Sequence, residues 1–526
     1  MNLTIDLYMW ISAVLPIILL LILMIKFRIS IVKSSAITLI ITLLISKFIY
    51  KANLLLIKVE TLKGIWSSLN ILLVVWAAIF LYEVINKAQV FKILKNELHT
   101  IISNKTLQVL TLGWVFASFL QGITGFGVPV AICSPLLVGI GIDPISAVVI
   151  TLLGQAWGST FGTLALAWDA LVNQTSLSTS KEIFIKTAIY SAIFIWIWNF
   201  ISGCLILLIY KKNRVKILEI LTVFFISFIH GFGQLLFIKI NPTLANFIPS
   251  IIAIIGILFI DKLPCFEVKI DVNKTIKKNS IKQLNKSFFT YYILTFLTLV
   301  FLLIKPIKNS LNRFNIGLSF PKTETGYNFI NYEITNYSPI YFFTHASLFL
   351  FISAISGYIY YRNKNWIDKP ELKSIFYSVT KKAMPSTLTI ISLIIISKLM
   401  SGSGQIYVLS QGIAKVISKS YIFISPFIGL LGSFITSSNM ASNILFGSFQ
   451  ETTARALNLN LSLTLAAQTV GGSIGSTLAP GNIILGAMTT NILGKEDKIL
   501  KKIMPISLLS AALIGLIATG MNIYLK

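Results

Sequence analysis

Long apolar runs recur along the whole of this 526-residue chain, and they limit what it can fold into. A helix that crosses a bilayer needs about 20 mostly apolar residues, and we find about twelve windows of this kind. The apolar stretches, thirteen in all with some shorter than a full span, lie in residues 8–24, 36–50, 66–84, 107–120, 145–168, 183–210, 217–237, 245–260, 288–304, 340–360, 387–399, 421–435 and 506–524. The sequence therefore predicts an all-α, polytopic integral membrane protein with about 12 transmembrane helices.

The composition agrees with a membrane protein and excludes other classes. Hydrophobic residues make up 55% of the chain and charged residues 12%, whereas an ordinary globular domain is about 25% charged. This excludes a soluble enzyme and a disordered chain. The net charge is +26, but the basic residues lie in short segments between the apolar runs, so they indicate topology in a lipid bilayer and no nucleic-acid partner. Cys133, Cys204 and Cys265 are far apart and predict neither a disulfide framework nor a metal site, and we expect no cofactor.

Three basic segments orient the chain, because lysine and arginine are enriched in short cytoplasmic loops. They cover residues 211–216, 262–286 and 362–382, and two apolar runs separate each from the next. All three are expected in the cytoplasm, with the N-terminus outside. The first run lacks the flanks of a cleaved signal peptide, so it should remain as a helix. We divide the chain into an N-terminal membrane repeat (1–260), a basic cytoplasmic loop (261–287) and a C-terminal membrane repeat (288–526).

The apolar pattern breaks at membrane depth in two places, near residues 119–132 and 434–450. Glycines and a proline weaken the first helix, and Ser, Thr and Asn side chains compete for the backbone of the second. Irregular backbone within a bilayer is tolerated only when it is buried in protein or lines a water-filled cavity. We therefore predict discontinuous or re-entrant helices, with a binding site at Gln121, Gly122, Thr124, Gly125, Gly127, Pro129, Ser437, Ser438, Asn439, Ser442 and Asn443.

A second pair of segments indicates an internal duplication. Residues 155–165 resemble residues 468–479, and each segment follows its break by a similar interval. Discontinuous helices at corresponding positions of two repeats are typical of a secondary transporter with its site near the midplane, here with two structurally repeated halves of inverted topology. The alternative is that small residues only let the helices pack closely. The candidate site residues of this pair are Gln155, Gln468, Gly471 and Gly472.

Residues 119–132 read Phe-Leu-Gln-Gly-Ile-Thr-Gly-Phe-Gly-Val-Pro-Val-Ala-Ile and resemble a motif of the bacterial L-lactate permeases, which also carry glycolate. Residues 136–141, 437–450 and 471–480 resemble further motifs of that family, and the chain length and helix layout agree. The resemblance implies a permease of the bacterial plasma membrane. It would move a small monocarboxylate, with L-lactate as the first candidate, by symport with a cation, usually H⁺.

Three charges of the family's motifs are absent, because Gln121 replaces Glu, Asn439 replaces Asp and Ser476 replaces Lys. Gln and Asn cannot titrate, so these positions cannot carry a proton. Either Na⁺ is the driving ion, held by unwound carbonyls and amide oxygens such as those of Asn439 and Asn443, or another group such as His230 takes the proton. Two further functions stay open: transport of another organic anion with Na⁺ coupling, and an anion channel.

An anion can still be bound without those charges. Helix N-termini at the breaks carry about half a positive charge. Lys398 precedes Ser401-Gly402-Ser403-Gly404 at or near a membrane break. It is either an anion counter-charge or a lysine that extends to the membrane interface, and His230 is either a proton relay or a neutral packing residue. We find no HExxH motif and no paired carboxylates, so the sequence predicts no enzyme.

Overall fold

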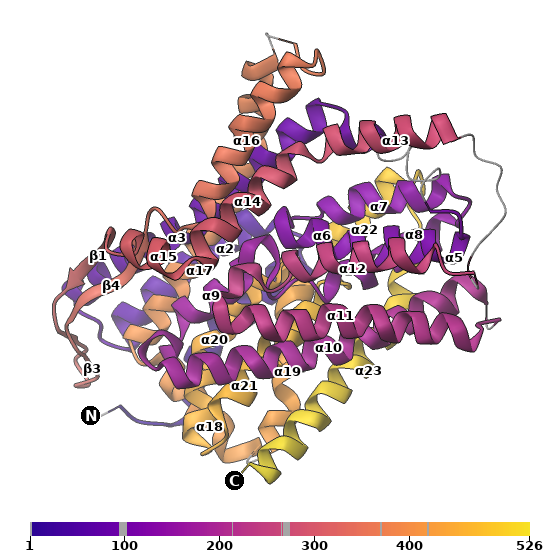
Figure 1. The fold of residues 1–526 in the computed structure, drawn as a ribbon. Helices are drawn as coiled ribbons and strands as arrows, with labels where there is room; N and C mark the ends of the chain where they lie inside the picture. The colour runs from indigo at the N-terminus through magenta and orange to yellow at the C-terminus, as the bar shows by residue number, and fades with distance from the viewer. Residues whose placement is uncertain are drawn as a thin grey trace.

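The computed structural model describes residues 3–93, 102–212, 214–264, 266, 274–368, 371–417 and 420–525, and for residues 274–280 it describes only the backbone. Cys265 and residues 267–273 of the basic loop lie outside the described residues. Up to residue 260 the helices are α1 (Leu7–Ile25), α2 (Ile31–Leu44), α3 (Leu54–Lys87), α5 (Lys105–Leu110), α6 (Phe116–Ile123), α7 (Val128–Gly139), α8 (Pro144–Ala156), α9 (Gly162–Gln174), α10 (Lys181–Lys211), α11 (Ile217–Ile240) and α12 (Phe247–Ile260) (Figure 1). π-Helical turns at Ile45–Ile49 and Thr111–Val115 extend α2 and join α5 to α6, and short 3₁₀ turns lie at Ser176–Thr179 and Pro242–Leu244.

The later part of the chain adds more helices and two small sheets. Its helices are α13 (Lys274–Ser287), α14 (Phe289–Leu303), α15 (Lys305–Leu311), α16 (Ala346–Asn363), α17 (Glu371–Gly402), α18 (Gln405–Ile417), α19 (Tyr421–Thr436), α20 (Asn439–Ala456), α21 (Leu461–Gly475), α22 (Pro480–Thr489) and α23 (Glu496–Tyr524). Its strands are β1 (Asn315–Phe320), β2 (Thr323–Glu324), β3 (Ile330–Asn331) and β4 (Ile334–Tyr341). β1 pairs with β4 and β2 with β3, both antiparallel.

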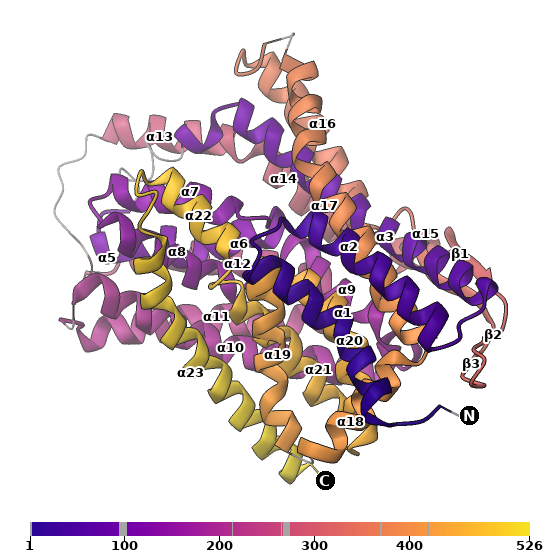
Figure 2. The ribbon, with the colours of Figure 1, turned by 180° about the vertical axis from the view of Figure 1, so that it is seen from behind.

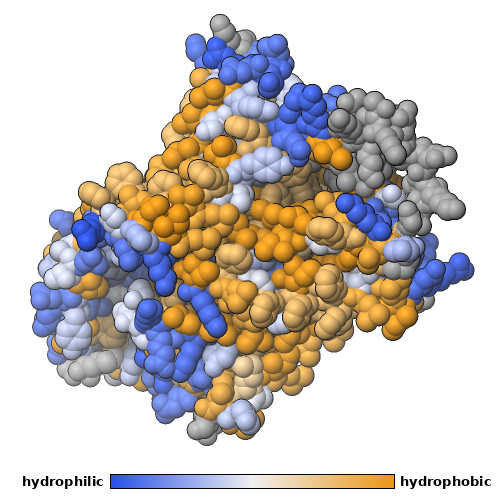
Figure 3. All heavy atoms as spheres, in the orientation of Figure 1, coloured by the Kyte–Doolittle hydropathy of each residue, from blue (hydrophilic) through white to orange (hydrophobic). Residues whose placement is uncertain are grey.

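Nine helices in the described part of the chain are long and apolar enough to cross a membrane, or ten if the end of α13 and α14, which meet at a bend of 56°, form one span. On α11 the exposed residues Leu221, Phe225, Phe228 and Phe232 recur every three or four positions, as on a helix with one face toward lipid. Figure 3 shows a broad hydrophobic area over α10, α11 and α12, with hydrophilic residues gathered at the end of α16 and around the strands. The predicted fold class, an all-α polytopic membrane protein, is confirmed.

Two apolar runs are not the single helices that the sequence predicts. Residues 145–168 divide into α8 and α9, because Thr163, Leu164 and Ala165 have left-handed φ angles of 49°, 54° and 71°. Residues 340–360 begin in strand β4, which is rich in the β-branched and aromatic residues that suit strands. Helix α16 then starts at Ala346, where the His345 side chain accepts a hydrogen bond from the Ser347 amide.

The first broken segment is a helical hairpin made of α5, α6 and α7, which we call the first hairpin. Its two ends lie together, because a Cβ placed on Gly141, just after α7, would be 4.0 Å from Lys105 Nζ at the start of α5. Near this base, Thr106 Oγ1 donates to Glu219 Oε1 at 3.1 Å, and Lys211 Nζ lies 2.8 Å from the same oxygen. Lys211 is the last residue of α10, so the base of the first hairpin lies at the C-terminal end of that helix.

The second broken segment is a hairpin made of α19 and α20, which we call the second hairpin. At its base the Tyr421 hydroxyl donates to Gln450 Oε1 at 2.8 Å. The adjacent Glu451 accepts a hydrogen bond from the Ser176 amide at 2.8 Å, and Ser176 precedes α10. This base therefore lies at the N-terminal end of α10, whose 31 residues span about 46 Å.

The two hairpins enter the helical bundle from opposite sides. The base of the first shares an end of α10 with the basic residues Lys211 and Lys212, and the base of the second lies at the other end. Inverted repeats have this arrangement. Figure 2, seen from behind, shows α1 and α2 on the side of the second hairpin, where α1 packs against α18 and α19.

Candidate functional site

The tip of the first hairpin is built from left-handed residues. Gly125, Phe126 and Gly127 have φ angles of 60°, 49° and 79°. This backbone suits glycine, because a residue with a Cβ is strained there. Space is also lacking: a Cβ on Gly125 would overlap Thr163 Oγ1, and one on Gly127 would lie 2.7 Å from Leu485 Cδ2. The first tip therefore packs closely against the starts of α9 and α22.

Side-chain hydrogen bonds form the tip of the second hairpin. Ser437 has a left-handed φ of 57°, and Ser438 caps α20 by accepting from the Ala441 amide at 3.4 Å. Thr436 Oγ1 donates to the Gly432 carbonyl at 2.7 Å and bonds to the Ser438 carbonyl at 3.0 Å. The Gly481 amide donates to Ser437 Oγ at 3.2 Å, which joins this tip to the start of α22 as well.

Two further breaks, between α8 and α9 and between α21 and α22, cross each other beside the tips. Each contains a Gly-Ser-Thr triplet, at residues 158–160 and 475–477. Ser159 Oγ and Ser476 Oγ are 3.3 Å apart, and Thr160 Oγ1 donates to the Thr469 carbonyl at 3.2 Å. Ser473 Oγ donates to the Ala156 carbonyl. The two duplicated segments are therefore in direct contact.

The four breaks enclose a central cavity of about 70 Å³. A water molecule takes about 30 Å³, so the space is small. Its lining residues, all in the described ranges, carry no formal charge. They are Gln121, Phe126, Gly127, Gln155, Ser159, Gly162, Thr163, Leu166, Ala167, Ser437, Ser438, Asn439, Met440, Ser476 and Asn482.

Six of the predicted site residues line this cavity: Gln121, Gly127, Gln155, Ser437, Ser438 and Asn439. Others support it from behind. Asn443 Nδ2 donates to the Ala167 carbonyl at 2.8 Å and to Thr469 Oγ1 at 2.9 Å, and Gln468 Nε2 donates to Ser442 Oγ at 3.2 Å.

The predicted small residues set how closely the helices approach. A Cβ on Gly122 would lie 2.8 Å from Nδ2 of Asn246, the residue just before α12. A Cβ on Gly471 would overlap the Pro426 carbonyl. Gly472 likewise leaves room for Asn439 Oδ1. Pro129 occupies the first turn of α7 and is buried. The packing role and the site role therefore coexist in these segments.

Three predicted residues lie elsewhere. Thr124 lines a larger cavity on the side of Lys381 and Lys382. Lys398 lines a cavity on the opposite side, where its Nζ donates to the Asn173 carbonyl at 2.9 Å. His230 is buried with its ring edge-on to Trp157, 4.2 Å between centroids, and does not line the central cavity.

Sequence reasoning did not include nine lining residues of the central cavity among its site residues, Thr163, Met440 and Asn482 among them, and it also missed Asp169. Asn482 follows Pro480-Gly481 at the start of α22, and Pro and Gly beside an apolar helix are a signal of a break. The left-handed turn at Thr163 has no such signal in its sequence.

Three buried amide oxygens in or beside the central cavity, two from the second hairpin and one from α8, lack a hydrogen-bond partner among the described residues. They are Asn439 Oδ1, Asn443 Oδ1 and Gln155 Oε1. The Asn439 amide nitrogen is already used, since it donates to Thr160 Oγ1 at 3.3 Å. Such oxygens can accept from a hydroxyl group or coordinate a cation.

Two larger cavities lie on either side of the central one. One, of about 530 Å³, shares Phe126, Ser437, Ser438, Met440 and Asn482 with it. We call it the inner cavity, because Lys381 and Lys382 line it and their basic segment is expected in the cytoplasm. The outer vestibule, of about 780 Å³, is lined mainly by polar side chains from the ends of α9 and α17 and from β4. Lys382 lines the inner cavity and Lys398 the outer vestibule. Both lie on α17, about 24 Å apart along its axis.

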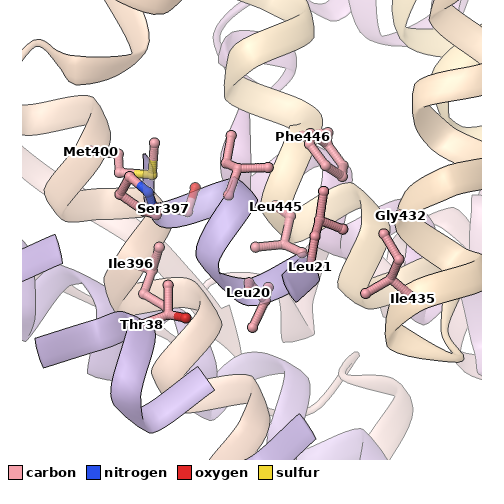
Figure 4. A pocket seen from close by; sticks show the side chains of 12 residues that line it. Leu20, Leu21, Thr38, Ile396, Ser397, Met400, Gly432, Ile435, Leu445 and Phe446 are labelled. Carbon is pink, nitrogen blue, oxygen red and sulfur yellow. The ribbon is translucent and has the colours of Figure 1, made fainter. Parts of the chain in front are cut away.

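A fourth space, behind the second hairpin, is different in character. It measures about 10 Å³ and lies between α1, α2, α17, α19 and α20, as Figure 4 shows. Leu20, Ile396, Ile435 and Phe446 point into it. It is too small and too apolar for an anion, so the second hairpin has an apolar back and a polar tip.

Polar helix breaks that meet around a small cavity, inside a bundle of membrane-spanning helices, are typical of polytopic transporters. The chain belongs to the L-lactate permease family, whose sequence profile matches residues 9–525. With its apolar helices, it is a multi-pass protein of the bacterial plasma membrane and a transporter rather than an enzyme.

Individual relatives and one solved structure are similar to the chain over most of its length. The chain is 26% identical to an L-lactate permease of Halalkalibacterium halodurans, over 93% of this chain and 92% of the relative. It is 28% identical to one of Streptococcus iniae (76% and 80%) and 23% identical to one of Escherichia coli strain K12 (87% and 84%). The crystal structure of the Alcanivorax borkumensis YdaH transporter aligns over 86% of this chain and 84% of that chain, with 12% identity and a TM-score of 0.44.

Proposed function

We propose that the protein carries a small monocarboxylate, with L-lactate as the first candidate, across the plasma membrane by symport with a cation. The observation that supports this most directly is the central cavity: four helix breaks from two hairpins and two broken helices surround one small, uncharged, polar space. The names of the relatives supply the candidate substrate.

Helix N-termini provide the attraction for the carboxylate. Helices α7, α20 and α22 begin at Val128, Asn439 and Pro480, each directly after a break. Gly127, Asn439 and Asn482, at or beside these starts, line the cavity. Each N-terminus carries about half a positive charge from its aligned peptide dipoles, so the three together attract an anion without a lysine. The free oxygens of Gln155 and Asn439 suit the hydroxyl group of a 2-hydroxy acid.

A carrier explains the cavities better than a channel does. The central cavity joins the inner cavity through five shared residues, whereas one turn of α9 separates it from the outer vestibule: Leu166 and Ala167 line the first and Asp169 the second. A site open to one side at a time is the basis of alternating access. A channel needs a continuous path through its filter.

The test is uptake into membrane vesicles that contain the purified protein. Labelled L-lactate, glycolate and pyruvate are offered separately, and vesicles preloaded with unlabelled L-lactate are compared with empty ones. We expect L-lactate to enter and preloading to accelerate its entry. Entry that preloading does not accelerate would favour the channel, and no entry of any of the three would refute the proposed substrate class.

The second candidate is transport of another organic anion with Na⁺ coupling. The free, buried oxygens of Asn439 and Asn443 favour it, since amide oxygens are permanent ligands that do not depend on pH. Uptake that requires a Na⁺ gradient and ignores a pH gradient would support this candidate. The role of His230 as a proton carrier stays a prediction. Its neighbour Trp157 lies directly after α8, at the break between α8 and α9.

A further inference from the structure

Asp169 occupies the turn of α9 that divides the central cavity from the outer vestibule. Two and three residues earlier, Ala167 and Leu166 line the central cavity, whereas Asp169 and Val172 line the vestibule. The carboxylate is half-buried. Within the ranges that the structure describes, no basic nitrogen lies within 4.0 Å of it. An ionisable residue at this depth is costly to keep charged, which makes it a functional candidate by default.

The vestibule contains other charged and titratable groups from three elements. Lys398 of α17 donates to the Asn173 carbonyl at 2.9 Å, one helical turn beyond Asp169. Lys308 of α15 also lines the space, and burial lowers the pKa of its ammonium group. The His345 ring nitrogens lie 2.6 Å from Asn70 Oδ1 and 2.7 Å from Ser347 Oγ. β4 contributes the tyrosines at positions 337 and 341.

The other elements packed against α9 provide no free carboxylate in the described residues. On α3, Glu60 is 2.7 Å from Lys63 and Glu83 is 2.5 Å from Lys382. On α20, Glu451 is 2.8 Å from Arg455. The sequences of α6 and α21 contain no titratable side chain. Asp169 is thus distinguished from its neighbours by its lack of a cationic partner.

We propose that Asp169 carries the proton that enters with the substrate anion. The inference rests on the proposed function, and it names the group that replaces the carboxyls absent at Gln121 and Asn439. Asp169 takes the proton from water in the outer vestibule. The same proton is released to the inner side after the turn of α9 has moved.

Electrostatics couples the proton to the substrate. A substrate carboxylate that passes between Lys398 and the central cavity comes close to Asp169, and two like charges in a low-dielectric space repel each other. Binding of the anion therefore raises the proton affinity of Asp169. By thermodynamic linkage, protonation of Asp169 raises the affinity for the anion by the same factor. Empty and doubly loaded forms are then favoured over half-loaded ones, which is what symport requires.

The experiment separates proton-driven uptake from exchange in vesicles, with L-lactate as the probe. Asp169→Asn imitates the protonated side chain permanently. We expect this variant to keep L-lactate exchange within about threefold of wild type, because exchange needs no net proton movement. Its uptake driven by an inward proton gradient should fall about tenfold or more. Asp169→Glu should retain proton-driven uptake. The matched control is Asp143→Asn, which changes an exposed N-cap carboxylate of α8 and preserves the cap.

Each other outcome is informative. Proton-driven uptake by Asp169→Asn at the wild-type level, or equal loss of exchange and uptake at normal abundance in the membrane, would overturn the role of Asp169. Wild-type uptake that depends on Na⁺ and ignores pH would overturn it while leaving the proposed function intact. A wild-type protein that neither takes up nor exchanges L-lactate would refute the proposed function itself, and this inference with it.

Discussion

The two hairpin tips reach the same cavity with different chemistry. The first tip is a run of three left-handed residues, two of them glycines, and neighbouring atoms leave no room for a Cβ on either glycine. The second has one left-handed residue, Ser437, and depends on hydrogen bonds from Thr436 and Ser438. A tip defined by sterics is intolerant of any added atom, whereas one defined by side-chain bonds can lose a single bond and remain folded. The comparison predicts unequal effects of mutation.

The largest effect is expected at the first tip. Gly125→Ala and Gly125→Leu place a Cβ on Thr163 Oγ1 in a left-handed backbone, so each should abolish uptake while the protein still reaches the membrane. Gly141→Ala is the control, because its φ is also left-handed, at 90°, but its nearest neighbour is 4.0 Å away. Transport by Gly125→Leu at the wild-type rate and abundance would remove Gly125 from the site.

A second large effect is expected behind the second tip. Asn443→Leu removes the donor to the Ala167 carbonyl and to Thr469 Oγ1, so two buried hydrogen bonds from α20 to its neighbours are lost. We expect loss of uptake and a stability loss of about 1–3 kcal/mol, measured by thermal unfolding in detergent beside transport. Asn309→Leu, on the exposed surface of α15, is the control. Unchanged uptake by Asn443→Leu would separate Asn443 from the cavity.

A moderate effect is expected at Gln121. Gln121→Glu restores a carboxyl to a small cavity, where desolvation favours the neutral acid and raises its pKa. The variant should therefore transport well at low pH, where Glu is protonated and resembles Gln, and progressively worse as the pH rises through that pKa. Uptake is measured from pH 5.5 to 8 with the internal pH held constant. An unchanged pH profile would mean that this position does not face the transport path.

The smallest effect is expected at Ser437. Ser437→Gly relieves the left-handed strain, worth up to about 1 kcal/mol, and gives up the bond from the Gly481 amide, worth a similar amount. Uptake should stay within about twofold of wild type. A complete loss would show that the Ser437 hydroxyl itself binds substrate, and the two tips would then differ more than their backbones suggest.

The sequence predicted both breaks, because glycine, proline and short polar side chains act on their own local backbone. It also predicted five lining residues within those breaks, and Gln155 from the duplicated segment. Asn482 and Thr163 were missed because they reach the cavity only through packing between helices far apart in the chain. The sequence predicts Lys398 at or near a membrane break. The cavity that a residue of α17 faces depends on how the neighbouring helices pack, and this packing places Lys398 in the outer vestibule.

The divided run at residues 145–168 has a similar cause. Its composition is that of one helix, and the left-handed turn from Thr163 to Ala165 is imposed by contacts with the first tip and with α21. The strand β4 at the start of the run at residues 340–360 could have been suspected from its Ile, Thr and Tyr residues. The division of the chain near residue 260 stays a prediction.

The claim that both hairpin tips form one substrate site is tested most directly by an experimental structure determined with the transported anion bound. The account predicts density for the anion in the central cavity, in contact with Gly127 of the first tip and Ser438 or Asn439 of the second. An anion held only in the outer vestibule near Lys398, with the central cavity empty under saturating conditions, would contradict it.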